Sequence, residues 1–410
     1  MKNISNKILV FVIVGFLSIS MILTMTLNFN LIINSLYENK EKLLDYNSTF
    51  STVSSSFGEN LIFIDKYANI YGGIQKVQTK GVWLNSEGNS YMVGPDGKIY
   101  PCAFFRNIDA DAYNVTKSER EELEKCAKAL SQFAKEVKTK NSKLFFVQAP
   151  ARYNPTFVPM PLYVTASKSK AVDFLSELLE EDENINLFNT QSYFHEQNMN
   201  FGDWFYRTDT HWTSKTAFVA YQELCKRINS RTEISIEESF FEETNWNFQT
   251  FKNTFLGSYG KIVGEGFAGK DDIDIASPNF ETDCRKISAK SPHVSIENGG
   301  GNIVIGTYNE AVLDKTRQSI DYGSYIGSDI CEVRIENTKA ATDKKILIIK
   351  DSFALPISAF LSTCFTETRL LDLRYFHDGV LSYLDAYKPD IVLVLYHPGD
   401  YNAGIFFNFQ

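Results

Sequence analysis

Ile346-Leu347-Ile348-Ile349 is a short continuous apolar run of the kind that forms a strand buried on both faces of a sheet. A second run, Ile391-Val392-Leu393-Val394-Leu395, has the same character, and a helical pattern from Gly379 to Tyr387 lies between the two. Fully buried strands joined through helices are typical of parallel sheets. The C-terminal part of the chain therefore predicts an α/β fold with a mainly parallel sheet.

The same alternation begins much earlier in the chain. Apolar residues recur every three or four positions between Glu119 and Lys138, which predicts an amphipathic helix, and Leu144-Phe145-Phe146-Val147 predicts the strand after it. Further helices are predicted at about 171–179 and 217–228, with another strand at 185–188. Helices should therefore cover both faces of the sheet.

The folded domain is predicted to span residues 81–410. Near its start, Gly94-Pro95-Asp96-Gly97 lies between two short apolar segments and indicates a hairpin. From about 235 to 338 the rhythm of helices and strands is lost among Asn, Gly, Asp and scattered aromatic residues. We expect a loop-rich insertion with short strands there. Its glycine-rich run, Asn298-Gly299-Gly300-Gly301, has neither of the common phosphate-binding spacings.

The N-terminal sequence predicts how the protein is oriented in the membrane. The stretch from Ile8 to Leu27 carries no charge and has about 20 residues, enough to cross a hydrocarbon core of about 30 Å. Lys2 and Lys7 precede it, which keeps the N-terminus cytoplasmic. A cleaved signal peptide is the alternative, but no clear Ala-x-Ala-like site follows. We expect a signal anchor in residues 1–30, a membrane-proximal spacer in 31–80, and a single-pass cell-membrane protein with its domain outside.

Composition excludes some classes of partner. The formal net charge of -9 disfavours nucleic acid, because phosphate binding needs a basic face. Six cysteines are widely and irregularly spaced without a Cys-x-x-Cys pair, so neither a disulfide nor a zinc site is expected. The five histidines are scattered, so no metal centre is indicated.

Three residues supply a carboxylate, an imidazole and a hydroxyl, the groups that a serine acyl-transfer site needs. Ser352 stands three residues after Ile349, and ligands of α/β sheets bind beyond the carboxyl ends of strands. Asp209 and His211 are two residues apart, so in an extended segment their side chains project to the same side. Thr213 suits the N-cap of the next helix. We predict a Ser352, His211 and Asp209 triad, although each motif alone is more often a turn or an ordinary surface feature.

Other side chains are candidates for substrate binding. Arg207 adjoins the Asp-x-His pair, with a surface salt bridge as the simpler interpretation. Tyr396 and His397 end the last strand at the same rim, where packing is an equal alternative. Arg152 follows an earlier strand. The backbone N–H groups at Ser352, close to a helix start, are candidates for stabilising an oxyanion.

Two segments carry a resemblance to a known family. The stretch Tyr206-Arg207-Thr208-Asp209-Thr210-His211-Trp212-Thr213 and the stretch Lys350-Asp351-Ser352-Phe353-Ala354 resemble the bacterial DHHW family and, more distantly, the SGNH-hydrolase-like proteins of alginate O-acetylation. Those proteins also place the Asp-x-His pair before the serine. Thr210 stands where the DHHW name has its first His, and Lys350 where SGNH enzymes usually carry Gly.

The resemblance implies an SGNH-hydrolase-like fold and an extracytoplasmic O-acetyltransferase that acts on an exported polysaccharide. Ser352 would attack the acyl donor, His211 would act as general base and Asp209 would orient His211. No cofactor is expected. Because acetyl-CoA is cytoplasmic, the resemblance also implies a membrane partner of the MBOAT type that carries acetyl outward. An esterase with the same triad and a non-catalytic polysaccharide-assembly protein remain as alternatives.

Overall fold

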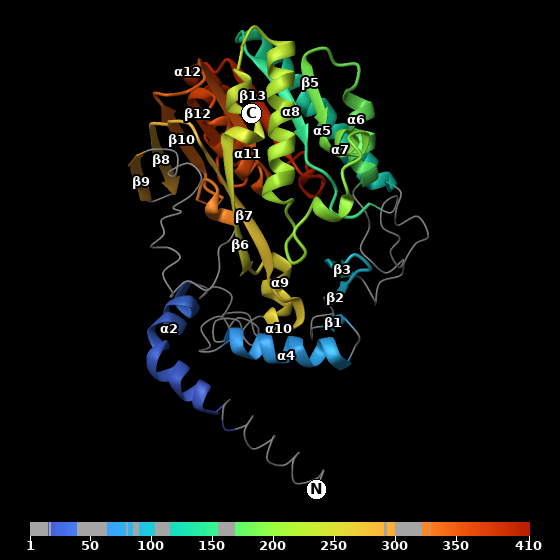
Figure 1. Cartoon of the computed structure of the whole chain (residues 1–410), viewed down its shortest axis with the longest axis vertical. Helices are drawn as coiled ribbons and strands as arrows, with labels where there is room; N and C mark the ends of the chain where they lie inside the picture. Colours follow the sequence, from blue (N-terminus) through green and yellow to red (C-terminus); the bar gives the residue numbers. More distant parts are fainter. Residues whose placement is uncertain are drawn as a thin grey trace. The chain divides into compact units, whose positions relative to one another are not determined.

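The chain forms two compact units, one of residues 1–80 and 262–267 and the other of residues 81–261 and 268–410. Figure 1 shows the fold as a computed structural model. The structure describes residues 15, 18–38, 64–78, 81–84, 90–102, 115–154, 169–290, 293–299, 322–327 and 329–410.

The larger unit is built on one large sheet. Among the described residues its strand order is β5-β4-β13-β11-β12-β10-β8-β9. The first five strands run parallel to one another, and β10, β8 and β9 add an antiparallel edge. The prediction of a mainly parallel sheet is confirmed. The strands are β4 (Lys143–Gln148), β5 (Ile185–Asn189), β8 (Cys284–Lys290), β9 (His293–Gly299), β10 (Glu332–Asn337), β11 (Thr342–Lys350), β12 (Phe365–Leu371) and β13 (Ile391–Tyr396).

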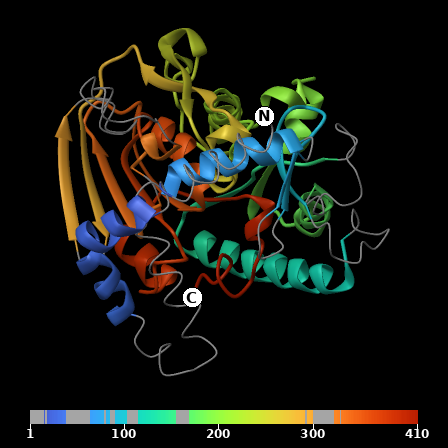
Figure 2. The same ribbon diagram turned by 90° about the horizontal axis from the view of Figure 1, so that it is seen from below.

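Alternating side chains of each central strand enter two separate cores. In β11, Ile346 and Ile348 pack into one core, while Leu347 and Ile349 pack into the other, and all four are fully buried. Burial of each such side chain contributes about 1.5–3 kcal/mol. Figure 2 gives a second view of the helices around the sheet. Helices α7 (Thr190–Glu196), α8 (Ser214–Arg231) and α11 (Leu355–Leu361) cover the first core, and α5 (Lys117–Thr139), α6 (Ser169–Leu179) and α12 (Val380–Tyr387) cover the second.

Local capping fixes where two of these helices begin. Thr116 and Glu119 form a reciprocal capping box at the start of α5. Thr213 caps α8, since its side chain accepts a hydrogen bond from the backbone N–H of Thr216. The predicted N-cap at Thr213 is therefore confirmed, and it holds the preceding Asp-x-His segment against the start of the helix.

The stretch from 235 to 338 contributes regular structure as well as loops. Strands β8, β9 and β10 come from it and extend the main sheet. β6 (Trp246–Phe255) and β7 (Asp271–Pro278) form a separate antiparallel pair, and α9 (Ser258–Val263) and α10 (Glu265–Ala268) lie between them in the chain. The apolar run 303–305 lies outside the described residues.

The larger unit also contains the predicted hairpin. β2 (Ser90–Val93) and β3 (Ile99–Cys102) pair antiparallel, and β1 (Val82–Leu84) adds to β2. Gly97 adopts a φ of 76° at the turn, a conformation that glycine adopts without strain. Short 3-10 helices complete the described part: η2 (Phe201–Asp203), η3 (Glu238–Phe240), η4 (Glu243–Asn245), η7 (Tyr322–Ser324), η8 (Ser352–Ala354) and η9 (Pro398–Asp400).

The smaller unit contains α2 (Phe29–Glu38) and α4 (Ile64–Gln78). The predicted anchor, Ile8 to Leu27, lies partly outside the described residues, which include only 15 and 18–27 of it. Among the helices that the structure describes, none combines the length and the apolar character needed to cross a membrane.

Candidate active site

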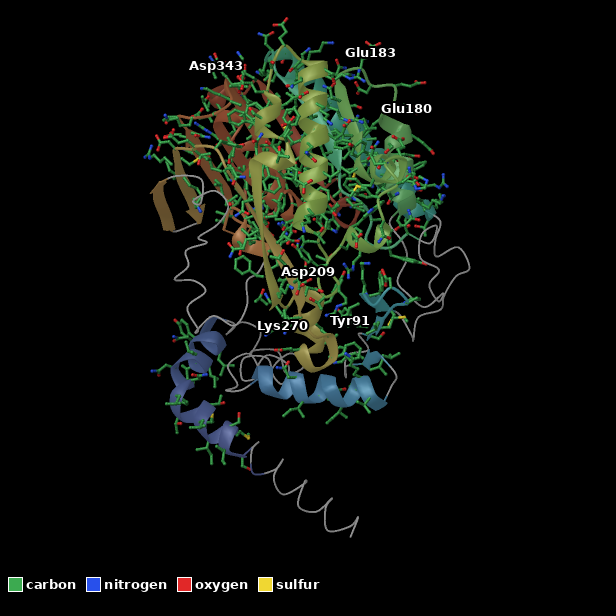
Figure 3. All side chains as sticks on the ribbon, in the orientation of Figure 1. Tyr91, Glu180, Glu183, Asp209, Lys270 and Asp343 are labelled. Atoms are coloured by element: carbon green, nitrogen blue, oxygen red, sulfur yellow. The ribbon has the colours of Figure 1, made fainter. Side chains whose placement is uncertain are left out.

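The three predicted catalytic residues lie at the carboxyl end of the parallel strands. Ser352 opens η8 directly after β11, and the Asp209 to His211 segment leads into α8. Figure 3 shows Asp209 at the end of the larger unit away from Asp343, which belongs to the start of β11. This is the edge at which α/β sheets bind their ligands.

The structure brings the three side chains into one hydrogen-bonded chain. His211 Nε2 lies 2.7 Å from Ser352 Oγ, and His211 Nδ1 lies 2.5 Å from Asp209 Oδ1. The backbone N–H of His211 also donates to Asp209 Oδ1 at 2.9 Å. Asp209 is buried and His211 and Ser352 are partly exposed, so the hydroxyl end of the chain is accessible while the carboxylate end is shielded.

Asp209 is held as a carboxylate by its surroundings. Burial alone would raise the pKa of Asp209, but hydrogen bonds from the ring and backbone of His211, its charge, and the backbone N–H of Ser258 lower that pKa well below the ordinary value. The Ser258 N–H lies 2.6 Å from Asp209 Oδ2. A carboxylate that remains ionised can orient an imidazole and stabilise its protonated form.

Aromatic groups fix the plane of the His211 ring. Tyr322 stacks on the ring at 4.0 Å between centroids and 12° between planes, and Phe353 lies at 5.0 Å. The indole N–H of Trp212 donates both to the hydroxyl of Tyr322 and to the backbone carbonyl of Phe353, each at 3.0 Å. Through Trp212, the ring of Tyr322 is therefore connected to the turn that carries Ser352.

The turn at Ser352 is capped by its own neighbour. The Asp351 carboxylate accepts the backbone N–H of Phe353 at 2.8 Å. The backbone N–H of Ser352 has no acceptor among the described residues, so it remains available to a ligand. Sequence reasoning expected several N–H groups here, and the structure assigns one of them to Asp351.

Two of the secondary candidates hold backbone segments together. Arg207 donates to the carbonyls of Ala268 and Lys270 at 2.5 and 3.0 Å. Arg152 donates to the carbonyls of Tyr206 and Arg207 at 2.9 and 3.1 Å. Both guanidinium groups thus stabilise the segment that leads to Asp209.

Tyr396 lies on the other face of the sheet from the His211 core. It is fully buried and its ring packs against Phe406 and Phe407. Its neighbour His397 instead turns toward the turn that carries Ser352, where its ring stacks on Phe353 at 4.7 Å. The side chains of Asp351, His397 and Asp400 offer ligand atoms within 4.8 Å of one another, a grouping that the sequence did not indicate.

Sequence reasoning missed Tyr322 and Ser258. Both lie in the irregular stretch from 235 to 338, where no periodicity or motif links them to the Asp-x-His segment. Only the folded structure identifies Tyr322 and Ser258, because their contacts join residues more than 45 positions apart in the sequence.

Comparison with known proteins agrees with this architecture. A model of the SGNH hydrolase-like domain of the acetyltransferase AlgX matches residues 107–258, a range that contains Asp209 and His211 but excludes Ser352. The sequence matches no curated protein. The predicted resemblance to the SGNH-hydrolase-like proteins of alginate O-acetylation is thus confirmed over residues 107–258.

Solved structures share the fold at low sequence identity. PatB1 from Bacillus cereus superposes with a TM-score of 0.62 at 19% identity, covering 78% of this chain and 100% of that chain. Its structure with a sulfonyl adduct gives the same TM-score and identity, with 78% and 99% covered. A DHHW family protein from Eubacterium siraeum gives 0.52 at 16% identity, with 78% and 93% covered.

Proposed function

We propose that this protein is an extracytoplasmic O-acetyltransferase that acetylates hydroxyls of an exported polysaccharide. The observation that carries the proposal is the 2.7 Å approach of Ser352 Oγ to His211 Nε2, with Asp209 on the opposite ring nitrogen. Nucleophile, base and orienting carboxylate stand in the order that acyl transfer through serine requires. The match to the SGNH hydrolase-like domain of the acetyltransferase AlgX supports acetyl as the group transferred.

The first half of the reaction acylates Ser352. As Ser352 Oγ attacks the donor's carbonyl carbon, its proton passes to His211 Nε2, and the Asp209 carboxylate stabilises the resulting imidazolium. The tetrahedral oxyanion is placed to accept a hydrogen bond from the Ser352 backbone N–H. Collapse breaks the bond to the leaving group, which takes the proton from His211, and leaves an acyl-serine.

The second half returns the enzyme to its starting state. A sugar hydroxyl attacks the acyl-serine and gives its proton to His211. The new tetrahedral intermediate then collapses, the bond from carbon to Ser352 Oγ breaks, and Ser352 recovers the proton from His211. The product is an acetylated sugar. If water took the place of the sugar hydroxyl, the same residues would perform ester hydrolysis.

The proposed location rests on the N-terminal part of the chain. The charge-free stretch from Ile8 to Leu27 follows two lysines, in agreement with a single-pass anchor. Most of the exposed large apolar side chains of the described residues belong to the smaller unit, among them Leu27, Phe29 and Val77. An anchor would keep the catalytic unit beside a membrane acyltransferase of the MBOAT type, which would supply acetyl groups from the cytoplasm.

An assay with a soluble acetyl ester, with and without an acceptor oligosaccharide, tests the proposal. We expect the oligosaccharide to be acetylated. Ser352→Ala and His211→Ala should each lower kcat roughly 10⁴- to 10⁶-fold, and the double variant should lose little more, because the residues act as a unit. Ser382→Ala and His377→Ala change exposed residues of the same types and should leave the rate unchanged.

Each rival gives a distinct result in this assay. Ser352-dependent acetate release that ignores the oligosaccharide, with no acetylated sugar formed, would establish an esterase instead. If Ser352→Ala cells acetylate their polysaccharide as well as the wild type does, the protein acts in assembly without catalysis, and the proposal is wrong.

A further inference from the structure

A second histidine, His397, packs against the turn that carries Ser352. It is not part of the hydrogen-bonded chain of Asp209, His211 and Ser352. It follows the end of β13, the parallel neighbour of β11 in the sheet. Its ring stacks on Phe353 with 6° between planes, on the residue directly after Ser352. Phe353 thus contacts the rings of both histidines, His397 and His211.

Asp351 connects His397 to the turn. One carboxylate oxygen of Asp351 accepts the Phe353 N–H, and the other accepts the His397 backbone N–H at 2.5 Å. Asp351 is fully buried. The carboxylate therefore joins the turn after β11 to the residue after β13, and any movement of Asp351 would move the backbone of Ser352.

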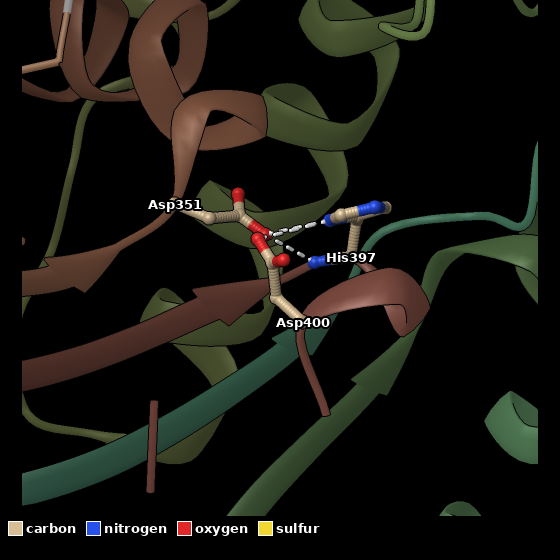
Figure 4. A group of neighbouring side chains, drawn as sticks. All are labelled: Asp351, His397 and Asp400. Atoms are coloured by element: carbon tan, nitrogen blue, oxygen red, sulfur yellow. Dashed lines mark hydrogen bonds and ion pairs between the residues drawn. The ribbon is translucent and has the colours of Figure 1, made fainter. Parts of the chain in front are cut away.

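The imidazole of His397 faces the carboxylates of Asp351 and Asp400 with one and the same ring nitrogen, as Figure 4 shows. Its Nδ1 is 3.2 Å from Asp351 Oδ2 and 3.3 Å from Asp400 Oδ2. Gly399 makes room for the ring, because a Cβ at this position would lie 2.3 Å from His397 Nε2. The N–H at Nδ1 can be shared by both carboxylates, and the charge of one protonated ring offsets much of their negative charge.

The protonated ring is the favoured state. Burial alone would lower the pKa of His397, but the hydrogen bonds and charges of Asp351 and Asp400 outweigh it and raise that pKa to about 9. Tyr396 and Tyr401, the other titratable groups between 396 and 401, stay neutral because burial raises the pKa of each phenol well above its ordinary value. His397 is thus the cation that offsets the two carboxylates.

We propose that His397 is a positioning residue for acyl transfer: its ring, which contacts Asp351 and Asp400 through Nδ1 and stacks on Phe353, fixes Asp351 and thereby the turn that carries Ser352. The inference rests on the proposed function of Ser352. When the ring loses its positive charge, the two neighbouring carboxylates at Nδ1 repel each other, and the Asp351 cap of the turn loosens. Because the pKa of His397 is raised, the ring keeps its charge through neutral pH and loses it, together with its hold on Asp351, as the pH rises through about 9.

The pH dependence of Ser352-dependent ester turnover tests the role. We expect wild-type kcat to fall as the pH rises through about 9. His397→Gln keeps a donor that does not titrate, so kcat at pH 7.5 should fall only about 10-fold, as for other residues that orient a reacting group, and the alkaline decline should vanish. Asp400→Asn should move the decline to lower pH. His377→Gln, the same change at an exposed histidine, should leave the profile unchanged.

Histidine side-chain NMR of the full chain gives a readout that needs no turnover. One of the five histidines should titrate near pH 9; its signal should be absent in His397→Gln and titrate lower in Asp400→Asn. The inference is wrong if the alkaline decline persists in His397→Gln or if no histidine titrates near 9. It is also wrong if activity needs a divalent cation that EDTA removes, since an ion bound by Asp351, His397 and Asp400 would replace the proton. Equal rates for wild type and Ser352→Ala would instead overturn the proposed function.

Discussion

Gly257 has no side chain, and Asp209 occupies the space that a side chain at this position would need. A Cβ at Gly257 would lie 2.3 Å from Asp209 Cβ and 2.6 Å from Asp209 Cα, so the clash would involve the backbone and could not be relieved by a rotamer change. Gly257→Ala should therefore displace the carboxylate from His211. We expect kcat for ester turnover to fall about 100-fold, the size of effect that follows a 1 Å misplacement of a reacting group.

A glycine elsewhere in the same unit provides the control. A Cβ at Gly404 would meet no atom closer than Asn402 Oδ1 at 3.5 Å, which is an ordinary contact. Gly404→Ala should retain wild-type kcat. If Gly257→Ala is equally active, the position of Asp209 is not critical, and its assignment as the orienting carboxylate loses its support.

The sequence indicated Asp209, His211 and Ser352 because each stands in a short motif at the end of a predicted strand or the start of a predicted helix. The same reasoning could not find Tyr322, which stacks on His211 from a segment without periodicity. The sequence also could not show whether Arg207 binds a ligand or holds two backbone segments together, since both roles need only a nearby hydrogen-bond acceptor. Those distinctions depend on contacts between distant segments.

The end of β11 is fixed by a buried ion pair. Lys350 Nζ lies 3.0 Å from Asp372 Oδ2 and 2.6 Å from Asp329 Oδ1, and both Lys350 and Asp372 are fully buried. Lys350→Met would leave Arg374 alone to balance two carboxylates. Removing one partner of a buried pair typically costs about 3–5 kcal/mol, so the free energy of unfolding in urea should fall by roughly that amount.

Lys344→Met in the same strand is the matched control. Its side chain is 40% exposed and pairs with Asp343 and Asp390 at the surface, so its loss should change the unfolding free energy by no more than about 1 kcal/mol. Similar values for both variants would show that the Lys350 pair does not stabilise the strand end.

The elements themselves were predicted where one periodicity dominates. The helix expected from Glu119 to Lys138 is α5, and the apolar runs 346–349 and 391–395 are the cores of β11 and β13. Short strands were expected between 235 and 338, but β8 and β10 could not be located there, because polar and charged residues interrupt their apolar pattern. Both strands pair with neighbours on either side, and this backbone pairing is not visible in the sequence.

In the whole molecule, one unit carries the proposed catalytic residues and the other carries the segment that is proposed to hold the protein in the membrane. The three residues of the proposed triad lie in the larger unit, whereas the charge-free stretch from Ile8 to Leu27 belongs to the smaller one. A protein in which an unrelated single-pass anchor of the same orientation replaces residues 1–30 should still acetylate polysaccharide in cells, because in the proposed mechanism the anchor need only hold the domain beside the proposed acetyl donor.

A cleaved signal peptide in place of residues 1–30 should give the opposite result in cells. The released domain should still turn over a soluble acetyl ester at the wild-type rate, because Ser352, His211 and Asp209 are unchanged, but polysaccharide acetylation should fall sharply as the local concentration of donor and domain is lost. Acetyl content of the isolated polysaccharide, with Ser352→Ala as the zero point, measures the effect. Full acetylation by the released domain would show that the N-terminal segment serves export alone and that no membrane-held donor is needed.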